Sequence, residues 1–172
     1  MEIPRPIAGD CAAYLLGYVE LVPDEPILET LASQIDETAA LLSAAGEERG
    51  EHHYAPGKWT VKEVVGHLAD TEQVFTYRAL RFARGDATPL AGFEQDDWVR
   101  HAGCGDRTLA EITSLLRSVR AASLALFATL PDAAWRRRGV ASGSEVVVSA
   151  YPWVSAGHEL HHRRILRERY GL

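Results

Sequence analysis

Cysteine is scarce in this sequence, which has only Cys11 and Cys104 among 172 residues. The two are far apart and neither belongs to a C-x-x-C pair, so the sequence does not indicate a disulfide framework. We therefore expect both thiols to be reduced.

Positive charge and long apolar runs are also lacking. The 18 Lys and Arg residues are outnumbered by 24 Asp and Glu, giving a formal net charge of −6, whereas a nucleic-acid-binding surface normally needs an excess of basic residues. No stretch reaches the roughly 18 apolar residues of a membrane span, and the N-terminus does not read as a signal peptide. We expect a cytoplasmic protein that binds neither nucleic acid nor membrane.

Hydrophobic residues make up 47% of the chain, enough for a substantial core at this length. Repeats and low-complexity tracts are absent. The sequence predicts one domain over residues 1–172.

Amphipathic helical patterns account for most of the chain. Apolar residues recur at helical spacing, and capping boxes at Thr60 and Thr108 mark two of the helix starts. A short strand at "VVV", Val146 to Val148, is an alternative before the last helix. The fold class is therefore all-α, a four-helix bundle. Its helices are expected at about residues 24–45, 60–85, 108–130 and 149–171.

The connection from Gly85 to Arg107 is longer than most loops in compact domains. It is long enough to cross the length of a helix, so the third helix need not run antiparallel to the second. Its segment "FEQDDW", Phe93 to Trp98, could cover a pocket or make an ordinary crossover contact.

The stretch "HELHH", His158 to His162, fits the H-E-x-x-H pattern of zinc proteases. Residues four apart on a helix present their side chains to a common point, so His158 and His162 can share one metal ion. The ten residues that follow contain no third histidine, which argues against a protease.

A third metal ligand is available in "VVGHLADTE", where His67 lies on the inward stripe of the second helix. Three histidines from two helices of a bundle make an open metal site, and we predict His67, His158 and His162 as its ligands. His161 is the competing choice on the last helix because i, i+3 also shares a face. The remaining histidines fall outside the helical stripes and are expected at the surface: His52, His53 and His101.

These residues carry a family resemblance. "YAPGKWTVKEVVGHLADTE" followed by "AGHELHHRRILRERY" resembles the DinB family, also called DinB/YfiT-like, from about the first helix to the C-terminus. The family implies an up-down-down-up bundle with a long crossover between helices two and three, and a three-histidine metal site. The matching motif residues are Trp59, Thr60, Glu63, His67, Leu68, Asp70, His158 and His162.

Three neutral imidazoles leave a coordination position open, as in a catalytic zinc site. The resemblance implies a divalent metal that activates a low-molecular-weight thiol, such as bacillithiol, mycothiol or glutathione, for attack on a small electrophile. The leading prediction is a metal-dependent thiol S-transferase, with zinc as the metal and nickel or another transition metal as alternatives. The rival functions are a non-catalytic metal-binding, homodimeric stress-response protein and a metal-dependent hydrolase.

Two carboxylates near the predicted ligands remain open in role. Asp70 could orient a ligand imidazole or face solvent. Glu159 is expected beside the metal face at best and paired with Arg163. Catalytic residues are not assigned, and no organic cofactor is indicated. Metal binding should compete with histidine protonation near the reference pKa of about 6.5.

Overall fold

The computed structural model describes residues 3–172. Each of the four helices predicted from the sequence corresponds to a long helix in the structure. The chain is mostly helical, but two short strands are present, so a strictly all-α class is not confirmed. The elements are α1 (Ala13–Val19), α2 (Ile27–Ala45), α3 (Val61–Ala83), α4 (Gln95–His101), α5 (Leu109–Ala128), β1 (Arg138–Ala141), β2 (Ser144–Val147) and α6 (Ala150–Glu168).

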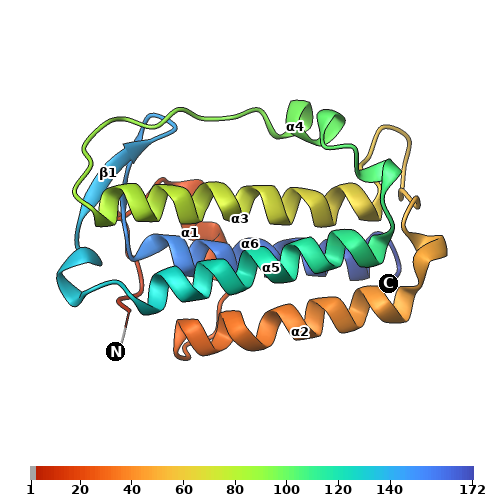
Figure 1. Cartoon of the computed structure of the whole chain (residues 1–172), viewed down its shortest axis with the longest axis horizontal. Coiled ribbons are helices and arrows are strands. Elements are labelled where there is room, and N and C mark those ends of the chain that lie inside the picture. The colour runs from red at the N-terminus through yellow and green to blue at the C-terminus, as the bar shows by residue number, and fades with distance from the viewer. Residues whose placement is uncertain (1–2) are drawn as a thin grey trace.

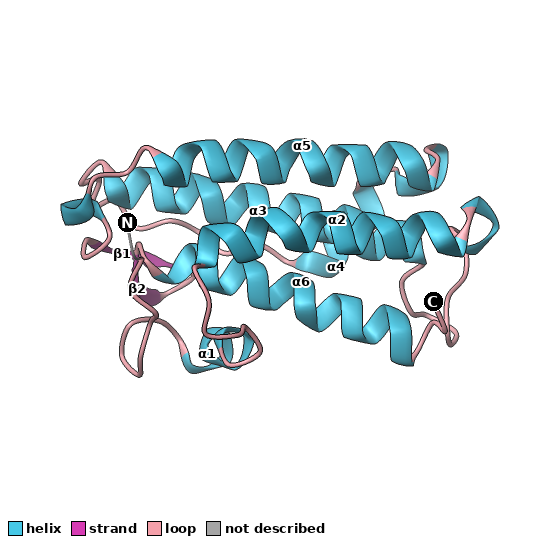
Figure 2. Ribbon diagram, turned by 90° about the horizontal axis from the view of Figure 1, so that it is seen from below, coloured by secondary structure: helices cyan, strands magenta, loops and turns pink. Residues whose placement is uncertain are grey.

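The four long helices lie side by side along the long axis of the molecule (Figure 1). Helix α3 packs on α5 and α6, and α2 packs on the same two helices. Seen from below, the strands and α1 lie toward one end of the bundle, with α1 against α6, and the C-terminus lies at the other end (Figure 2).

Both predicted capping boxes are confirmed. At the start of α3 the Glu63 amide donates to Thr60 Oγ1 over 3.1 Å, and the Thr60 amide donates to a Glu63 carboxylate oxygen over 2.7 Å. Thr108 and Glu111 repeat the arrangement at the start of α5. These reciprocal bonds satisfy amide donors that have no partner within the helix, so they fix where α3 and α5 begin.

The long connection between α3 and α5 passes along the outside of α3 and contains α4 (Figure 1). Buried Val99 anchors α4. The start of the connection is tied to β1, because the Leu90 amide donates to the Val140 carbonyl over 2.9 Å. The up-down-down-up order of the helices stays a prediction, which the course of this crossover favours.

Strands β1 and β2 form an antiparallel hairpin that the sequence patterns only hinted at. The turn residues Ser142 and Gly143 have φ angles of 52° and 76°, as a two-residue type I′ turn requires. Gly139 in β1 allows close contact with α3, since a Cβ there would lie 2.2 Å from the Phe82 ring. The hairpin therefore closes one end of the bundle.

Apolar side chains form two core clusters along the bundle, one including Leu31 and Phe75, the other including Ile35 and Leu68. Between Leu68 and Phe75, α3 carries a buried Glu72. The core is thus divided by a polar layer at mid-height. Among residues 3–172, no helix is long and apolar enough to cross a membrane.

Candidate metal centre

Helices α3 and α6 bring the three predicted ligands together. The Nε2 atom of His158 lies 3.1 Å from Nε2 of His67 and 3.1 Å from Nε2 of His162. One ligand atom from each residue falls within 4.8 Å of the other two. The helical i, i+4 spacing stacks His158 and His162 on one face of α6, and the contact of α6 with α3 supplies His67.

This geometry fits one transition-metal ion. With metal–nitrogen bonds of about 2.0–2.1 Å, a tetrahedral ion holds its nitrogen ligands about 3.3 Å apart, close to the two His–His distances. Histidine nitrogens suit zinc, nickel, copper and iron better than magnesium or calcium. The cluster therefore supports a divalent metal, without identifying which one.

Aromatic side chains surround the three imidazoles. The Trp59 ring centroid lies 4.8 Å from that of His67, and its plane is stacked within 17° of the His162 ring at 6.5 Å. Tyr18 of α1 meets His158 edge-on at 5.3 Å. These contacts restrict rotation of the imidazoles and keep water from their flanks, which favours a preformed site.

Burial holds all three imidazoles in the neutral form that a metal ligand needs. Desolvation lowers the pKa of His67 to about 4, against a smaller opposing effect of the Asp96 carboxylate. Desolvation, with the neighbouring histidines, lowers the pKa of His162 to about 3 and that of His158 well below its usual value. Each ligand is ready to bind a metal without first losing a proton at neutral pH.

Thr71 is the residue that orients His67. Its hydroxyl lies 3.3 Å from His67 Nδ1, which leaves Nε2 for the metal. Asp70, the other residue that the sequence offers for this role, is half-buried and makes no hydrogen bond to a histidine within residues 3–172. The i, i+4 spacing of Thr71 from His67 was the sequence signal for it.

The other histidines stay outside the cluster. His161 lies on the side of α6 where it meets Tyr18 edge-on at 5.4 Å, so His162, and not His161, joins the cluster. As expected, His53 and His101 are exposed, while His52 is partly buried.

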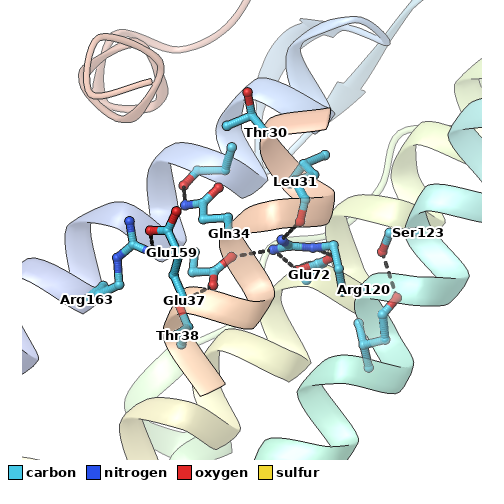
Figure 3. Close-up of polar contacts among 12 residues, drawn as sticks. Thr30, Leu31, Gln34, Glu37, Thr38, Glu72, Arg120, Ser123, Glu159 and Arg163 are labelled. Carbon is cyan, nitrogen blue, oxygen red and sulfur yellow. Dashed lines mark hydrogen bonds and ion pairs between the residues drawn. The ribbon is translucent and has the colours of Figure 1, made fainter. Parts of the chain in front are cut away.

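Glu159 points into the bundle rather than toward the metal face. It is 1% exposed, accepts a hydrogen bond from Thr38 Oγ1 and pairs with Arg120 at 2.7 Å (Figure 3). Arg120 also forks onto Glu72 with two bonds of 2.8 Å. The expected pair of Glu159 with Arg163 was wrong, because α5 presents a buried guanidinium to Glu159 and Arg163 pairs with Glu37 instead.

Replacing Glu159 with glutamine is therefore expected to leave metal affinity unchanged within about twofold. The free energy of unfolding should fall by about 1–3 kcal/mol, since Arg120 loses one of two buried charged partners. Metal titration and urea unfolding of the variant would measure the two effects. Glu168→Gln, which removes an exposed i, i+4 pair with Arg164, is the control and should change neither quantity appreciably. Lost metal binding in Glu159→Gln alone would contradict this assignment.

Burial of the histidines also predicts how the stability of the metal-free protein depends on pH. Because their folded pKa values lie below the unfolded value near 6.5, the unfolded chain binds more protons as the pH falls below 6.5. Stability present above pH 6.5 should be lost between pH 6.5 and about 4, by up to about 1.4 kcal/mol per pH unit for each histidine. Urea unfolding of chelated protein at pH 7.5, 6 and 5 would measure the slope.

The metal-free His158→Ala variant provides the matched comparison, since it lacks one of these groups. Its slope below pH 6.5 should be shallower. Equal slopes for the variant and the native chain would show that His158 is protonated normally in the folded state. Because burial lowers the pKa values of the folded histidines, protons should compete with the metal only at a pH well below the reference pKa of about 6.5. Stabilisation by metal should therefore persist at pH 5.

A cavity of about 330 Å³ opens beside the cluster and includes His162 in its wall. Gln95 and Asp96 of α4 line it, so the segment "FEQDDW" does reach over this pocket. Trp59 and Tyr170 form apolar walls. The cavity gives a small molecule access to the side of the histidine cluster.

The fold and this cluster define a helical bundle in which three convergent histidines could hold a divalent metal. The sequence matches the DinB superfamily over residues 30–166, and the chain belongs to that superfamily.

Curated relatives carry names that agree with a metal site. A protein of Bacillus licheniformis named "Putative metal-dependent hydrolase" is 30% identical over 165 residues, 88% of this chain and 91% of that protein. A protein of Geobacillus thermodenitrificans with the same description is 25% identical over 145 residues, 79% of each chain.

Solved structures share the fold. YfiT from Bacillus subtilis, described as "a probable metal-dependent hydrolase with an unusual four-helix bundle topology", superposes with a TM-score of 0.65 at 20% identity, covering 85% of this chain and 89% of YfiT. A mycothiol-dependent maleylpyruvate isomerase gives a TM-score of 0.69 at 15% identity, covering 84% of this chain but 61% of the isomerase.

Proposed function

We propose that this protein is a metal-dependent transferase in which His67, His158 and His162 hold one divalent metal, zinc in the first instance, and which joins a low-molecular-weight thiol to a small electrophile. The observation that carries the proposal is the convergence of three neutral Nε2 atoms with no carboxylate among them in the described chain. A fourth position is then open toward a ligand.

A bound metal would supply Lewis-acid chemistry, lowering the pKa of a thiol or a water that binds to it. The chain's own residues do the rest. Thr71 fixes the ring of His67, Trp59 packs against two of the imidazoles, and the adjoining cavity receives the small molecule. A thiol needs no protein base once its pKa is lowered, which matches the engagement of Glu159 with Arg120.

Hydrolysis is the second candidate, and the names of the relatives favour it. The proton acceptor of an H-E-x-x-H protease is the glutamate of that motif. Here Glu159 is enclosed by Thr38 and Arg120, so a hydrolase would need another acceptor. This is why we place thiol transfer first.

The proposal includes a cytoplasmic location, because low-molecular-weight thiols stay reduced there. We also propose that the protein is a homodimer. A non-catalytic stress-response protein, the rival function, would be a homodimer too. Light scattering of the purified chain tests the dimer without bearing on catalysis.

Turnover with each class of nucleophile separates the candidates. The protein loaded with zinc or nickel is incubated with 1-chloro-2,4-dinitrobenzene and glutathione, bacillithiol or mycothiol, and in parallel with nitrophenyl esters and no thiol. We expect the metal-loaded protein to form thioether faster than either the metal-free protein or the His158→Ala variant does. Ester cleavage without thiol would favour the hydrolase, and no turnover in either assay would favour the binding protein.

A further inference from the structure

The cavity beside the histidine cluster carries two opposite charges. Its lining includes Lys58, in the loop before α3, and Asp96, in the first turn of α4. The rest of the lining is aromatic, aliphatic or uncharged, with Tyr54, Trp59 and Tyr170 contributing rings. Larger cavities elsewhere in the described chain contain none of the clustered histidines.

Both charged side chains are exposed, and neither is paired within the described chain. Within residues 3–172, the Lys58 ammonium and the Asp96 carboxylate form no hydrogen bond or ion pair, either with each other or with another side chain. Nearby charges are paired within the protein, Asp97 with Arg100 and Lys62 with Glu47 and Glu51. Two unpaired opposite charges more than about 4 Å apart are therefore available to one small molecule.

The position of Asp96 is fixed by the packing of its helix. Val99 is buried, α4 contacts α3, and the rings of Phe93 and Trp98 lie 4.4 Å apart on either side of Asp96 in the sequence. The carboxylate is close enough to act electrostatically on the His67 imidazole. A group that binds the metal and also carries a positive charge would place that charge near Asp96.

We propose that this cavity selects a small zwitterion, a molecule that carries a metal-binding group together with an ammonium that pairs with Asp96 and a carboxylate that pairs with Lys58. The inference rests on the proposed function, since it names the class of small molecule that the same site receives. The aromatic walls add contact with the aliphatic part of the molecule. The cavity of about 330 Å³ is at the small end of ligand pockets, which fits an amino-acid-sized compound.

Four thiols of similar length test the charge pattern: homocysteine carries both charges, 3-mercaptopropylamine a positive one, 3-mercaptopropionate a negative one, and 2-mercaptoethanol none. Each is titrated into the cobalt-loaded full-length protein, and the absorption band of sulfur bound to cobalt reports binding. Desalting after each titration, followed by metal analysis, checks that homocysteine has not removed the cobalt. Homocysteine is expected to bind most tightly and 2-mercaptoethanol most weakly.

Charge-removing variants assign each end of the ligand. Asp96→Asn should weaken homocysteine and 3-mercaptopropylamine by roughly fivefold, the value of about 1 kcal/mol for a partly exposed ion pair, and leave 3-mercaptopropionate unchanged. Lys58→Gln should weaken homocysteine and 3-mercaptopropionate and leave 3-mercaptopropylamine unchanged. Asp97→Asn, next to Asp96 but paired with Arg100, is the matched control and should alter no affinity.

The outcomes separate this inference from the proposed function. If all four thiols give the cobalt–sulfur band with equal affinity, the zwitterion assignment is wrong while the open metal site stands. If none gives the band although cobalt is bound, both fail. If Asp97→Asn has the same effect as Asp96→Asn, the preference reflects the general charge of α4 and the assignment to the cavity is wrong.

Discussion

Replacing His158 with alanine is expected to lower the affinity for a divalent metal by more than about a hundredfold. His158 Nε2 lies between the other two ligand atoms, at 3.1 Å from each, so its loss leaves two nitrogens at the greater separation. Loss of an outer partner of a ligand already costs roughly 10- to 100-fold, and a direct ligand should cost more. Competition between the protein and a chromophoric chelator measures the affinity.

The control for this variant is His161→Ala on the same helix. His161 is a histidine three residues further along α6 that stays outside the cluster. Its removal should leave metal affinity within about twofold of the native value, and circular dichroism should show both variants to be helical. A protein that loses its metal through His161→Ala and retains it through His158→Ala would overturn the ligand set.

Replacing Arg120 with leucine should lower the free energy of unfolding by about 3–5 kcal/mol, a large part of the stability of a typical domain. Arg120 is 1% exposed and is shared by the carboxylates of Glu72 and Glu159, and it also donates to the Leu31 carbonyl over 2.8 Å (Figure 3). Without it, two carboxylates remain in the core with no cation. Urea unfolding monitored by circular dichroism measures the loss.

Arg117→Gln is the matched control for Arg120→Leu. Arg117 lies one turn earlier on α5, and its side chain is 47% exposed and pairs with Asp36, which is 70% exposed. Exposed pairs contribute about 1 kcal/mol or less, so this variant should unfold close to the native protein. Similar losses of unfolding free energy for the two variants would show that the buried ion pairs of Arg120 stabilise the fold no more than an exposed pair does.

The sequence predicted the parts of this fold that depend on local pattern. Helical periodicity located the four long helices, capping boxes at Thr60 and Thr108 marked two starts, and the spacing of His158 and His162 gave a shared face. Burial of His67 followed from its place in the apolar stripe of α3. In each case the signal lies within a few residues of the feature it predicts.

Features that depend on contacts between distant segments were not predicted. Glu159 was expected to pair locally with Arg163, but it pairs with Arg120, 39 residues earlier in the chain. Helices α1 and α4 have 7 residues each, and the strands of the hairpin have 4, too short for a clear period. The shared cavity of Lys58 and Asp96 depends on the path of the crossover over α3, which no local pattern specifies.

X-ray absorption of the zinc-loaded protein, before and after addition of a thiol, tests the central claim most directly. The account predicts three imidazole nitrogens at about 2.0–2.1 Å, with a sulfur at about 2.3 Å appearing when the thiol is added. His158→Ala should have fewer imidazole nitrogens around zinc or lose the zinc, whereas His161→Ala should match the native protein. A fourth protein ligand that stays in place when thiol is added, or an imidazole count unaffected by His158→Ala, would contradict an open metal centre built from His67, His158 and His162.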